Sequence, residues 1–321
     1  MKLGVLTVPL GAMSLADAAK YLSGLGVQTL ELGAGGCPGK AHLNPQELLG
    51  HKDKIDEVKR IMKDNNLEIS VLSTHGNAVH PNPEVAAMYH NDFEDTVRLA
   101  HELEVDTVVT FSGCPGDSAG SKYPNWVTCP WPEDFLEILD YQWNEVLIPY
   151  WQKEAEFVKP YGIKKIAFEM HPGFCVYNPA SMLKIRAAVG DILGANFDPS
   201  HLIWQGIDIC EAIRALEGAI YHFHAKDTKI YKHNCDVKGV LDVNHYSDEK
   251  NRSWIFRSLG YGNDYGFWKD IISTLRLVGY EGSVSIEHED SLMSSREGLE
   301  KAISFLHEVM IKEQPGEMFW A

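Results

Sequence analysis

The sequence has little of what a disulfide-bonded or thiolate-rich protein requires. Its cysteines are scattered and form no C-x-x-C pair, and no secretory peptide precedes the first strand-like run. This pattern is typical of free thiols in a reducing cytosol. We therefore expect a cytoplasmic protein whose cysteines are packing residues, namely Cys37, Cys114, Cys129, Cys175, Cys210 and Cys235.

Long hydrophobic runs and basic stretches are also missing. Charge or glycine interrupts every apolar segment within about ten residues, whereas a membrane helix needs about 20. The 45 acidic residues outnumber the 29 basic ones and give a formal charge of -16. No stretch concentrates Lys and Arg as binding to a phosphate backbone requires. We expect a soluble protein that binds neither membranes nor nucleic acid.

Short β-rich apolar runs alternate with segments of helical period along the whole chain. The predicted strands are Leu3–Val8, Thr29–Leu32, Ile69–Ser73, Thr107–Phe111, Ile166–Met170, Ala195–Asp198, Ile220–His224 and Ser283–Glu287. The predicted helices are Ser14–Leu25, Asp56–Asn66, Glu84–Leu103, Pro132–Lys159, Pro179–Val189, Asp208–Leu216, Tyr265–Val278 and Ser294–Lys312. Repeated β-α units of this kind close into a barrel more readily than into an open sheet, whose edge strands would be shorter and more polar. The sequence predicts an α/β fold, a single-domain (β/α)8 TIM barrel over residues 1–321.

Two connections are longer than usual, Gly113–Trp131 after the fourth strand and Lys226–Tyr265 after the seventh. Loops of this length are usually lids, binding loops or subunit contacts. Their aromatic side chains could cover a substrate or could anchor the loops onto the barrel. These aromatics are Tyr123, Trp126, Trp131, Tyr246, Trp254 and Tyr261.

Four predicted strands end in residue types that bind divalent metals. The segments are Ala167–His171, Asn196–His201, Tyr221–His224 and Ser285–Glu289. The active sites of such barrels lie at the C-terminal strand ends, so these side chains should meet there. Three carboxylates and one imidazole form a mixed oxygen and nitrogen set, which suits Mn²⁺ or Mg²⁺ better than a thiolate-rich zinc site. Any one of them could instead cap a helix or pair with lysine, but four together favour a metal.

Residues two apart in a strand face the same way, which pairs several of these side chains near the barrel mouth. The pairs are Glu169 with His171, His222 with His224, and Glu287 with Glu289. One member of each pair could reach a central ion, while the other supports a ligand or contacts the substrate. Lys226 and Asp227 could bind substrate hydroxyls or pair with each other.

Two further polar residues end early strands. Glu31 and His75 follow the second and third apolar runs, so both could point into the substrate cavity or be buried structural groups. The glycine-rich turn at residues 33–36 lacks the spacing of a P-loop or of a dinucleotide-binding fold. We interpret it as a tight connection between strand and helix.

The succession Phe-Glu, Phe-Asp-Pro-Ser-His, His-Phe-His-Ala-Lys-Asp and Ile-Glu, with Gly-Tyr-Glu-Gly before the last strand, resembles the xylose isomerase-like barrel superfamily, chiefly its sugar (phosphate) isomerases and epimerases. The resemblance spans nearly the whole chain. It implies a divalent metal, with Mn²⁺ preferred and Mg²⁺, Co²⁺ or Zn²⁺ as alternatives. The implied ligands are Glu169, Asp198, His224 and Glu287, and His201 would touch substrate oxygens.

In ketose 3-epimerases of this superfamily, the residues that match Glu169 and Glu287 also act as opposed acid and base. They move a proton beside a carbonyl through a metal-bound enediolate. The chain departs from that pattern, because Cys175 and Ile230 stand where those enzymes have a second Glu and an Arg. This departure argues against an ordinary ketose 3-epimerase.

The segment Glu169–Phe174, Glu-Met-His-Pro-Gly-Phe, is similar to a subgroup that includes the large subunits of enzymes cleaving C-glycosides after oxidation at carbon 3. In that subgroup the histidine matching His171 is the proposed base. By this resemblance His171 would abstract the proton at carbon 2 of a 3-keto sugar. It could instead only orient Glu169 through a hydrogen bond. His222 is the weaker candidate for a base and would support a ligand.

The resemblance favours a metal-dependent sugar isomerase or epimerase, with a lyase of 3-keto glycosides as the alternative. A non-catalytic sugar-binding barrel and an abasic-site endonuclease are weaker readings. The expected partner is a small sugar or keto-glycoside. The aromatic tail at residues 318–320 would be a sticky patch if exposed, so we expect it to dock on the barrel or on another subunit. We also expect a homo-oligomer or a complex with a small partner subunit.

Overall fold

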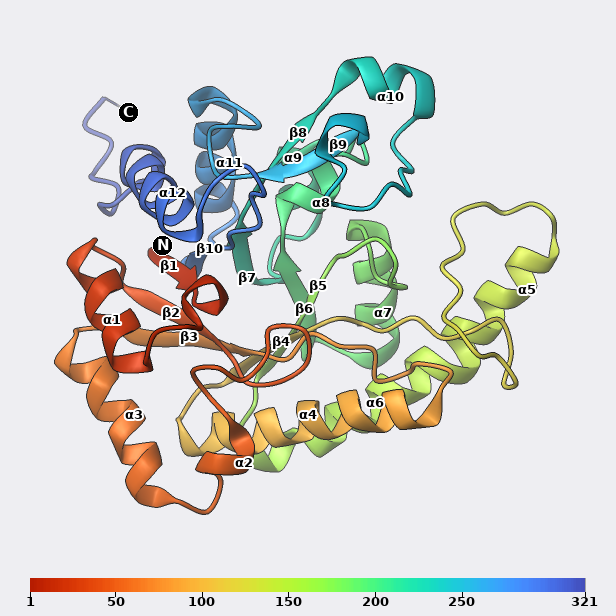
Figure 1. Cartoon of the computed structure of the whole chain (residues 1–321), viewed down its shortest axis with the longest axis horizontal. Helices are drawn as coiled ribbons and strands as arrows, with labels where there is room; N and C mark the ends of the chain where they lie inside the picture. The colour runs from red at the N-terminus through yellow and green to blue at the C-terminus, as the bar shows by residue number, and fades with distance from the viewer. Residues whose placement is uncertain (321) are drawn as a thin grey trace.

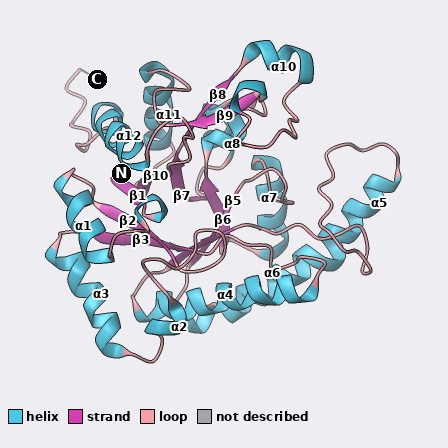
Figure 2. Ribbon diagram, viewed as in Figure 1, coloured by secondary structure: helices cyan, strands magenta, loops and turns pink. Residues whose placement is uncertain are grey.

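A computed structural model describes residues 1–320. Eight parallel strands close into a barrel in the order β1-β10-β7-β6-β5-β4-β3-β2, and Figures 1 and 2 show the helices around it. The strands are β1 (Lys2–Leu6), β2 (Thr29–Gly33), β3 (Glu68–Ser73), β4 (Thr107–Thr110), β5 (Lys165–Glu169), β6 (Leu193–Phe197), β7 (Ile220–Ala225) and β10 (Ser283–Ile286). The predicted (β/α)8 barrel is confirmed, although most strands end one or two residues before the predicted positions.

The helices follow the predicted order with additions. They are α1 (Leu15–Gly24), α2 (Pro45–Leu48), α3 (Lys52–Asp64), α4 (Pro83–Glu102), α5 (Asp134–Asp140), α6 (Ile148–Phe157), α7 (Pro179–Val189), α8 (Pro199–Ile203), α9 (Ile209–Ala215), α10 (Lys232–Lys238), α11 (Tyr265–Leu277) and α12 (Ser295–Val309). The single helix predicted over Pro132–Lys159 is α5 and α6 joined by a π-helical stretch, Tyr141–Leu147. Side-chain caps begin several helices, because Ser14, Asn178 and Ser294 each accept a hydrogen bond from a backbone N–H of the first turn.

The alternation of side chains along the strands separates the core from the site. Inside the barrel, Val71, Val109 and Ala167 from three adjacent strands form a small buried apolar cluster. Residues two positions further along a strand also point inward. Ala167 therefore precedes Glu169 on the same face of β5. The polar residues of the site follow this apolar cluster toward the C-terminal ends of the strands.

The connection after β7 contains regular structure that was not predicted. β8 (Asp227–Ile230) pairs antiparallel with β9 (Trp254–Arg257), and α10 lies between them in sequence. Trp254 is buried and stacks on Trp204 with ring centroids 4.6 Å apart. Trp126 of the other long connection is partly buried against Tyr177. These two tryptophans anchor their loops onto the barrel.

Two further predictions concern the cysteines and the aromatic C-terminal tail. Cys114 and Cys175 are buried, but Cys37 and Cys129 are exposed, so the prediction that all six cysteines are packing residues is wrong. The tail at residues 318–320 is exposed and extends away from α12 (Figure 1), so it does not dock on the barrel. Its contact with another subunit stays a prediction.

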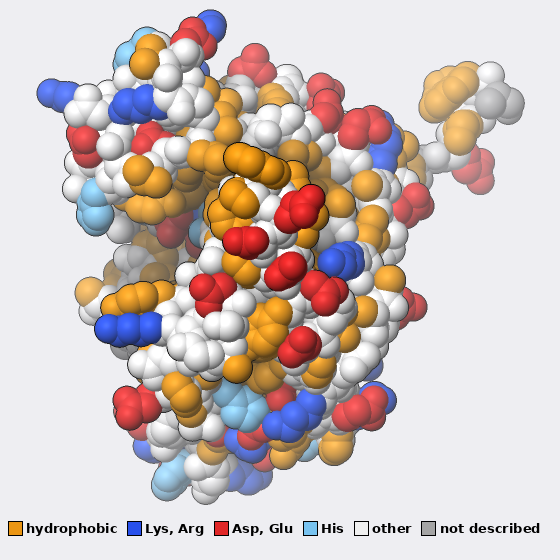
Figure 3. Space-filling model, turned by 90° about the vertical axis from the view of Figure 1, so that its right-hand side faces the viewer, with side chains coloured by type: hydrophobic (Ala, Val, Ile, Leu, Met, Phe, Trp, Pro, Cys, Tyr) orange, Lys and Arg blue, Asp and Glu red, His pale blue; other side chains and the backbone are white. Residues whose placement is uncertain are grey.

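Within residues 1–320, no helix is long and apolar enough to cross a membrane. Figure 3 shows acidic side chains interspersed with Lys and Arg on one face.

Asp227 fastens the second long loop to the barrel. Its carboxylate accepts hydrogen bonds from the backbone N–H groups of Gly260, Gly262 and Asn263, and from the indole N–H of Trp268. The side chain is buried. A buried carboxylate with this many donors keeps the segment after β9 in place.

We expect Asp227→Ala to lower the free energy of unfolding by about 3 kcal/mol, because several buried N–H groups would lose their acceptor. Denaturant unfolding followed by circular dichroism measures the change. Asp236→Ala, at an exposed ion pair of α10, is the control and should change stability by less than about 1 kcal/mol. Equal stability of the two variants would contradict the anchoring role.

Candidate active site

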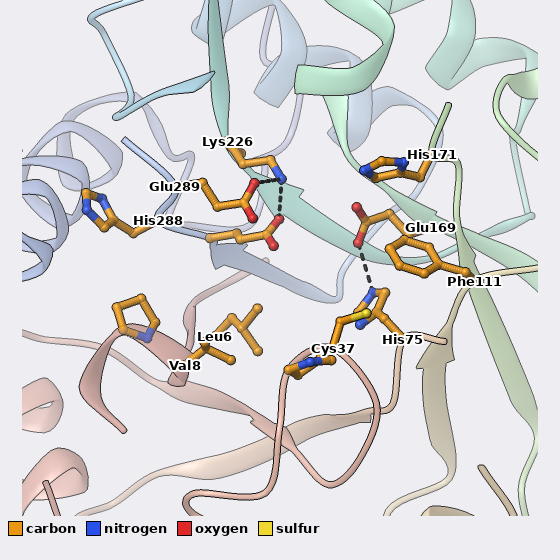
Figure 4. A pocket seen from close by; sticks show the side chains of 13 residues that line it. Leu6, Val8, Cys37, His75, Phe111, Glu169, His171, Lys226, His288 and Glu289 are labelled. Atoms are coloured by element: carbon orange, nitrogen blue, oxygen red, sulfur yellow. Dashed lines mark hydrogen bonds and ion pairs between the residues drawn. The ribbon is translucent and has the colours of Figure 1, made fainter. Parts of the chain in front are cut away.

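A cavity of about 210 Å³ opens at the C-terminal ends of the barrel strands. The lining residues are Leu6, Val8, Pro9, Cys37, Pro38, His75, Phe111, Glu169, His171, Lys226, Glu287, His288 and Glu289. Figure 4 shows that His171, Glu169 and Phe111 form one wall, while Lys226 and Glu289 lie across from them. None of the six loop aromatics is among these lining residues, so in this structure the loops do not cover the cavity with them.

The four predicted metal ligands lie together at this cavity. Glu169, Asp198, His224 and Glu287 each offer one ligand atom, and the four atoms lie within 4.8 Å of one another. They come from β5, from the residue after β6, from β7 and from the residue after β10. The sequence prediction that these strand ends meet is therefore confirmed as geometry.

Asp198 shows best how this group suits a metal. Its Oδ1 accepts a hydrogen bond from the backbone N–H of Ser200, which caps α8. Its Oδ2 is buried and has no hydrogen-bond partner. Lys226 Nζ lies 3.0 Å from this oxygen, and we interpret the contact as an ion pair without hydrogen-bond geometry. Burial raises the pKa of Asp198 to about 7, since the anion is incompletely compensated.

The donor set also fits the cation predicted from the sequence. The group consists of three carboxylates and one imidazole, and Asp198 contributes an oxygen that lacks a hydrogen-bond partner. Mn²⁺ and Mg²⁺ bind ligands of these types, and Zn²⁺ also accepts them. A cation here would replace the compensation that the buried carboxylates otherwise take from neighbouring side chains.

Glu169 is held by two histidines. His201 Nε2 lies 3.0 Å from one carboxylate oxygen, and His75 Nε2 lies 2.9 Å from the other. Burial alone would raise the pKa of Glu169, but the hydrogen bonds and charges of His201, His75 and His224 hold it well below the usual range. Burial lowers the pKa of His201 to about 3. Glu169 is therefore an anion oriented from both sides.

Lys226 balances the acidic side of the cavity. Its ammonium lies 2.7 Å from Glu287, 2.9 Å from Glu289 and 3.0 Å from Asp198. Burial opposes the charge on Lys226, yet the surrounding carboxylates raise its pKa well above normal. For Glu287, the ammonium of Lys226 and the ring of His224 outweigh burial and lower the pKa to about 2.

Glu31 lies beneath the ligand group and not in the lining of the cavity. Its carboxylate is 2.9 Å from His222 Nε2 and 3.0 Å from His224 Nε2, and it accepts a hydrogen bond from Ser285. Burial alone would raise the pKa of Glu31, but these two histidines hold it well below normal. The contact with Glu31 leaves His224 Nδ1, 3.1 Å from Glu287, as the ring nitrogen directed at the ligand group. Glu31 thus orients His224, one of the predicted ligands.

His171 differs from the histidines that contact Glu31 and Glu169 because it faces the cavity without a carboxylate partner. Its Nδ1 lies 2.6 Å from the carbonyl oxygen of Pro172, a contact that requires the proton on Nδ1 and leaves the lone pair on Nε2. Burial lowers the pKa of His171. The imidazole is therefore neutral and able to accept a proton.

The structure places the other predicted residues in different surroundings. His75 lines the cavity, whereas His201 and His222 support Glu169 and Glu31 from outside its lining. Lys226 lines the cavity and does not pair with Asp227, whose oxygens are taken up by the loop. Substrate contacts of these residues stay predictions. Cys37, Phe111 and His288 also line the cavity and were not predicted to do so; only their position near predicted strand ends could have indicated them.

The chain belongs to the xylose isomerase-like TIM barrel family, whose model matches residues 19–309. It is 36% identical over 312 residues to the uncharacterized protein YfiH of Bacillus subtilis, covering 97% of this chain and 99% of that protein. The name of that relative states no activity.

Solved structures share the fold. The probable 3-DHS dehydratase AsbF of Bacillus anthracis superposes with a TM-score of 0.67 at 18% identity, over 96% of this chain and 99% of that one. IolI with a bound zinc atom gives a TM-score of 0.66 at 18% identity, over 96% and 98%. A D-psicose 3-epimerase gives 0.64 at 14% identity, over 97% and 99%. At these identities the likeness shows the barrel and leaves the chemistry to this chain's own residues.

We expect Glu169→Gln and Asp198→Asn to weaken the binding of Mn²⁺ at the cavity by at least about 100-fold while the fold is retained, because each removes an anionic ligand. Metal content after dialysis measures the loss, and circular dichroism checks the fold. Glu289→Gln removes a cavity carboxylate outside the ligand group and should leave affinity within about fivefold. Full metal content in Asp198→Asn would contradict the ligand assignment.

Proposed function

We propose that the protein is a divalent-metal-dependent isomerase or epimerase of keto sugars that removes a proton next to a carbonyl. The observation that carries the proposal is the neutral imidazole of His171, which lines the same cavity as Glu169 and Glu287 of the four-residue metal-ligand group. The two features are what enolisation requires, a base for the proton and compensation for the negative charge that develops on oxygen.

The site residues divide these tasks. A divalent cation held by the ligand group would polarise the carbonyl and stabilise charge on its oxygen. His171 accepts the proton at Nε2, because its Nδ1 is already committed to the carbonyl of Pro172. Glu169 and Glu287 have pKa values far below neutral, which suits anionic ligands better than proton acceptors. This supports His171 over the two carboxylates as the base.

The charges around the cavity favour an unphosphorylated substrate. Among the lining residues, the only Lys or Arg side chain is Lys226, and three carboxylates surround its ammonium. A phosphate would meet Glu289 and Glu287 without a free cationic side chain to pair with, and like charges placed together cost several kcal/mol. We therefore propose a neutral keto sugar or keto-glycoside.

A lyase that cleaves 3-keto glycosides is the second candidate. Its first step is the same proton transfer, after which a leaving group departs from the neighbouring carbon instead of a proton returning. AsbF, which shares the fold, is described as a probable dehydratase, and loss of water from a keto compound would follow the same course. Both candidates rest on His171 as the base.

Proton exchange tests the proposal directly. The Mn²⁺-loaded protein is incubated in D₂O with ketoses, aldoses and 3-keto glucosides, and NMR follows deuterium uptake beside the carbonyl. We expect uptake with at least one neutral keto sugar, and a decrease of about 10²- to 10⁴-fold in His171→Ala because the base is lost. The products then distinguish isomerase from lyase.

His101→Gln, at an exposed histidine of α4, is the control for this exchange and should retain full activity. Normal exchange in His171→Ala would reject His171 as the base. If the metal-loaded wild-type protein causes no deuterium uptake in any substrate of the panel, the result would count against enolisation and favour a binding role.

A matched pair of substrates tests the charge argument. We expect kcat/KM for a neutral ketose to exceed that for the same sugar carrying a terminal phosphate by at least about 100-fold, because the phosphate would approach Glu287 and Glu289. Steady-state assays of both compounds measure the ratio. A preference for the phosphorylated sugar would overturn the substrate class and leave the proposed base untouched.

A further inference from the structure

A second group of metal-ligand side chains lies away from the cavity, between the neighbouring helices α4 and α6 (Figure 1). His90 and Glu94 are one helical turn apart on α4 and so project from the same face. Glu154 reaches them from α6. Each of the three can offer one ligand atom so that all lie within 4.8 Å of one another. The group shares no residue with the ligand group of the cavity.

Glu154 is the member that ordinary packing does not explain. Its side chain is 0% exposed, and neither carboxylate oxygen has a hydrogen-bond partner. The nearest side-chain nitrogen atoms that could pair with it are His90 Nδ1 at 3.7 Å and Lys153 Nζ at 3.9 Å, both beyond hydrogen-bond distance. The Lys153 side chain is largely exposed, so solvent screens its charge. A buried carboxylate is normally hydrogen-bonded, paired or bound to a metal.

His90 lies between the two carboxylates, with Nδ1 facing Glu154 and Nε2 facing Glu94. Arg98 binds Glu94 Oε2 at 2.6 Å, and Glu94 Oε1 is left 3.3 Å from His90 Nε2. The Tyr150 hydroxyl lies 3.1 Å from His90 Nδ1. Both His90 and Glu94 remain partly exposed, which gives an ion from solvent a way in.

The two helices are fixed against each other beside this group. Phe93 of α4 and Trp151 of α6 are buried and pack edge to face with centroids 5.5 Å apart. Rigid elements of this kind hold a ligand set more precisely than loops do. Burial raises the pKa of Glu154 to about 7, which reflects the same missing partner that the geometry shows.

We propose that His90, Glu94 and Glu154 form a second cation site that binds a divalent transition metal, with Zn²⁺ as the best match and water completing its coordination. One imidazole and two carboxylates leave an open position, as zinc sites with three protein ligands do. The ion would compensate the buried charge of Glu154. It would also tie α4 to α6, the helices that precede β4 and β5 in the chain.

Zinc stoichiometry separates the two sites. Metal-free full-length protein is dialysed against Zn²⁺ and the bound metal is quantified. We expect two ions per chain in the wild type, one in Glu154→Gln, one in Asp198→Asn, and none in the double variant. Glu154→Gln should fold normally, because it replaces an uncompensated buried anion by a neutral side chain of the same shape.

A second measurement guards against a variant that binds no metal because it is damaged. In the Asp198→Asn background, Co²⁺ should produce visible d–d absorption and raise Tm, and both effects should be lost with His90→Ala. Glu156→Gln, at an exposed ion pair on α6, should leave the stoichiometry unchanged. If Asp198→Asn binds no Zn²⁺ and gives no Co²⁺ spectrum while its circular dichroism is native, Glu154 is a protonated structural residue and the proposal is wrong.

Discussion

Buried negative charge at the C-terminal end of the barrel is the constraint on which the site depends. Glu31, Glu169, Asp198 and Glu287 are all removed from most solvent contact, and burying several carboxylates together is costly unless cations or donors face them. Two sets of partners face these carboxylates. Below, His222 and His224 face Glu31; above, Lys226 and a bound cation would share the remaining charge.

This charge balance also explains why the site histidines differ. His224, between Glu31 and Glu287, has a pKa raised well above normal despite burial, whereas burial lowers the pKa values of His201 and His171. Identical side chains therefore take different protonation states within one site. The surroundings therefore distinguish the three histidines without any change of residue type, and a cation bound at the ligand group would require His224 to lose its extra proton.

The sequence predicts the parts of this arrangement that local patterns encode. Apolar runs that end at or next to Glu169, Asp198, His224 and Glu287 place each predicted ligand on its own strand, and the barrel closure then brings the four together. Contacts between distant segments are not encoded in this way. Glu31 lies 191 residues from His222, so its role beneath the ligands requires the closed barrel. The β8–β9 pair was missed because its strands are joined by a long segment without a hairpin signal.

The group of His90, Glu94 and Glu154 also depends on a contact between distant segments that local sequence patterns do not encode. His90 and Glu94 form an i,i+4 pair that resembles any exposed ion pair on an amphipathic helix, and Glu154 reads as one more charge on the polar side of α6. The packing of α6 against α4, where Phe93 contacts Trp151, places Glu154 in a buried position in which its carboxylate has no hydrogen-bond partner. A carboxylate without a partner in a packed interface therefore indicates function more strongly than its place in the sequence does, since packing alone would favour an apolar residue there.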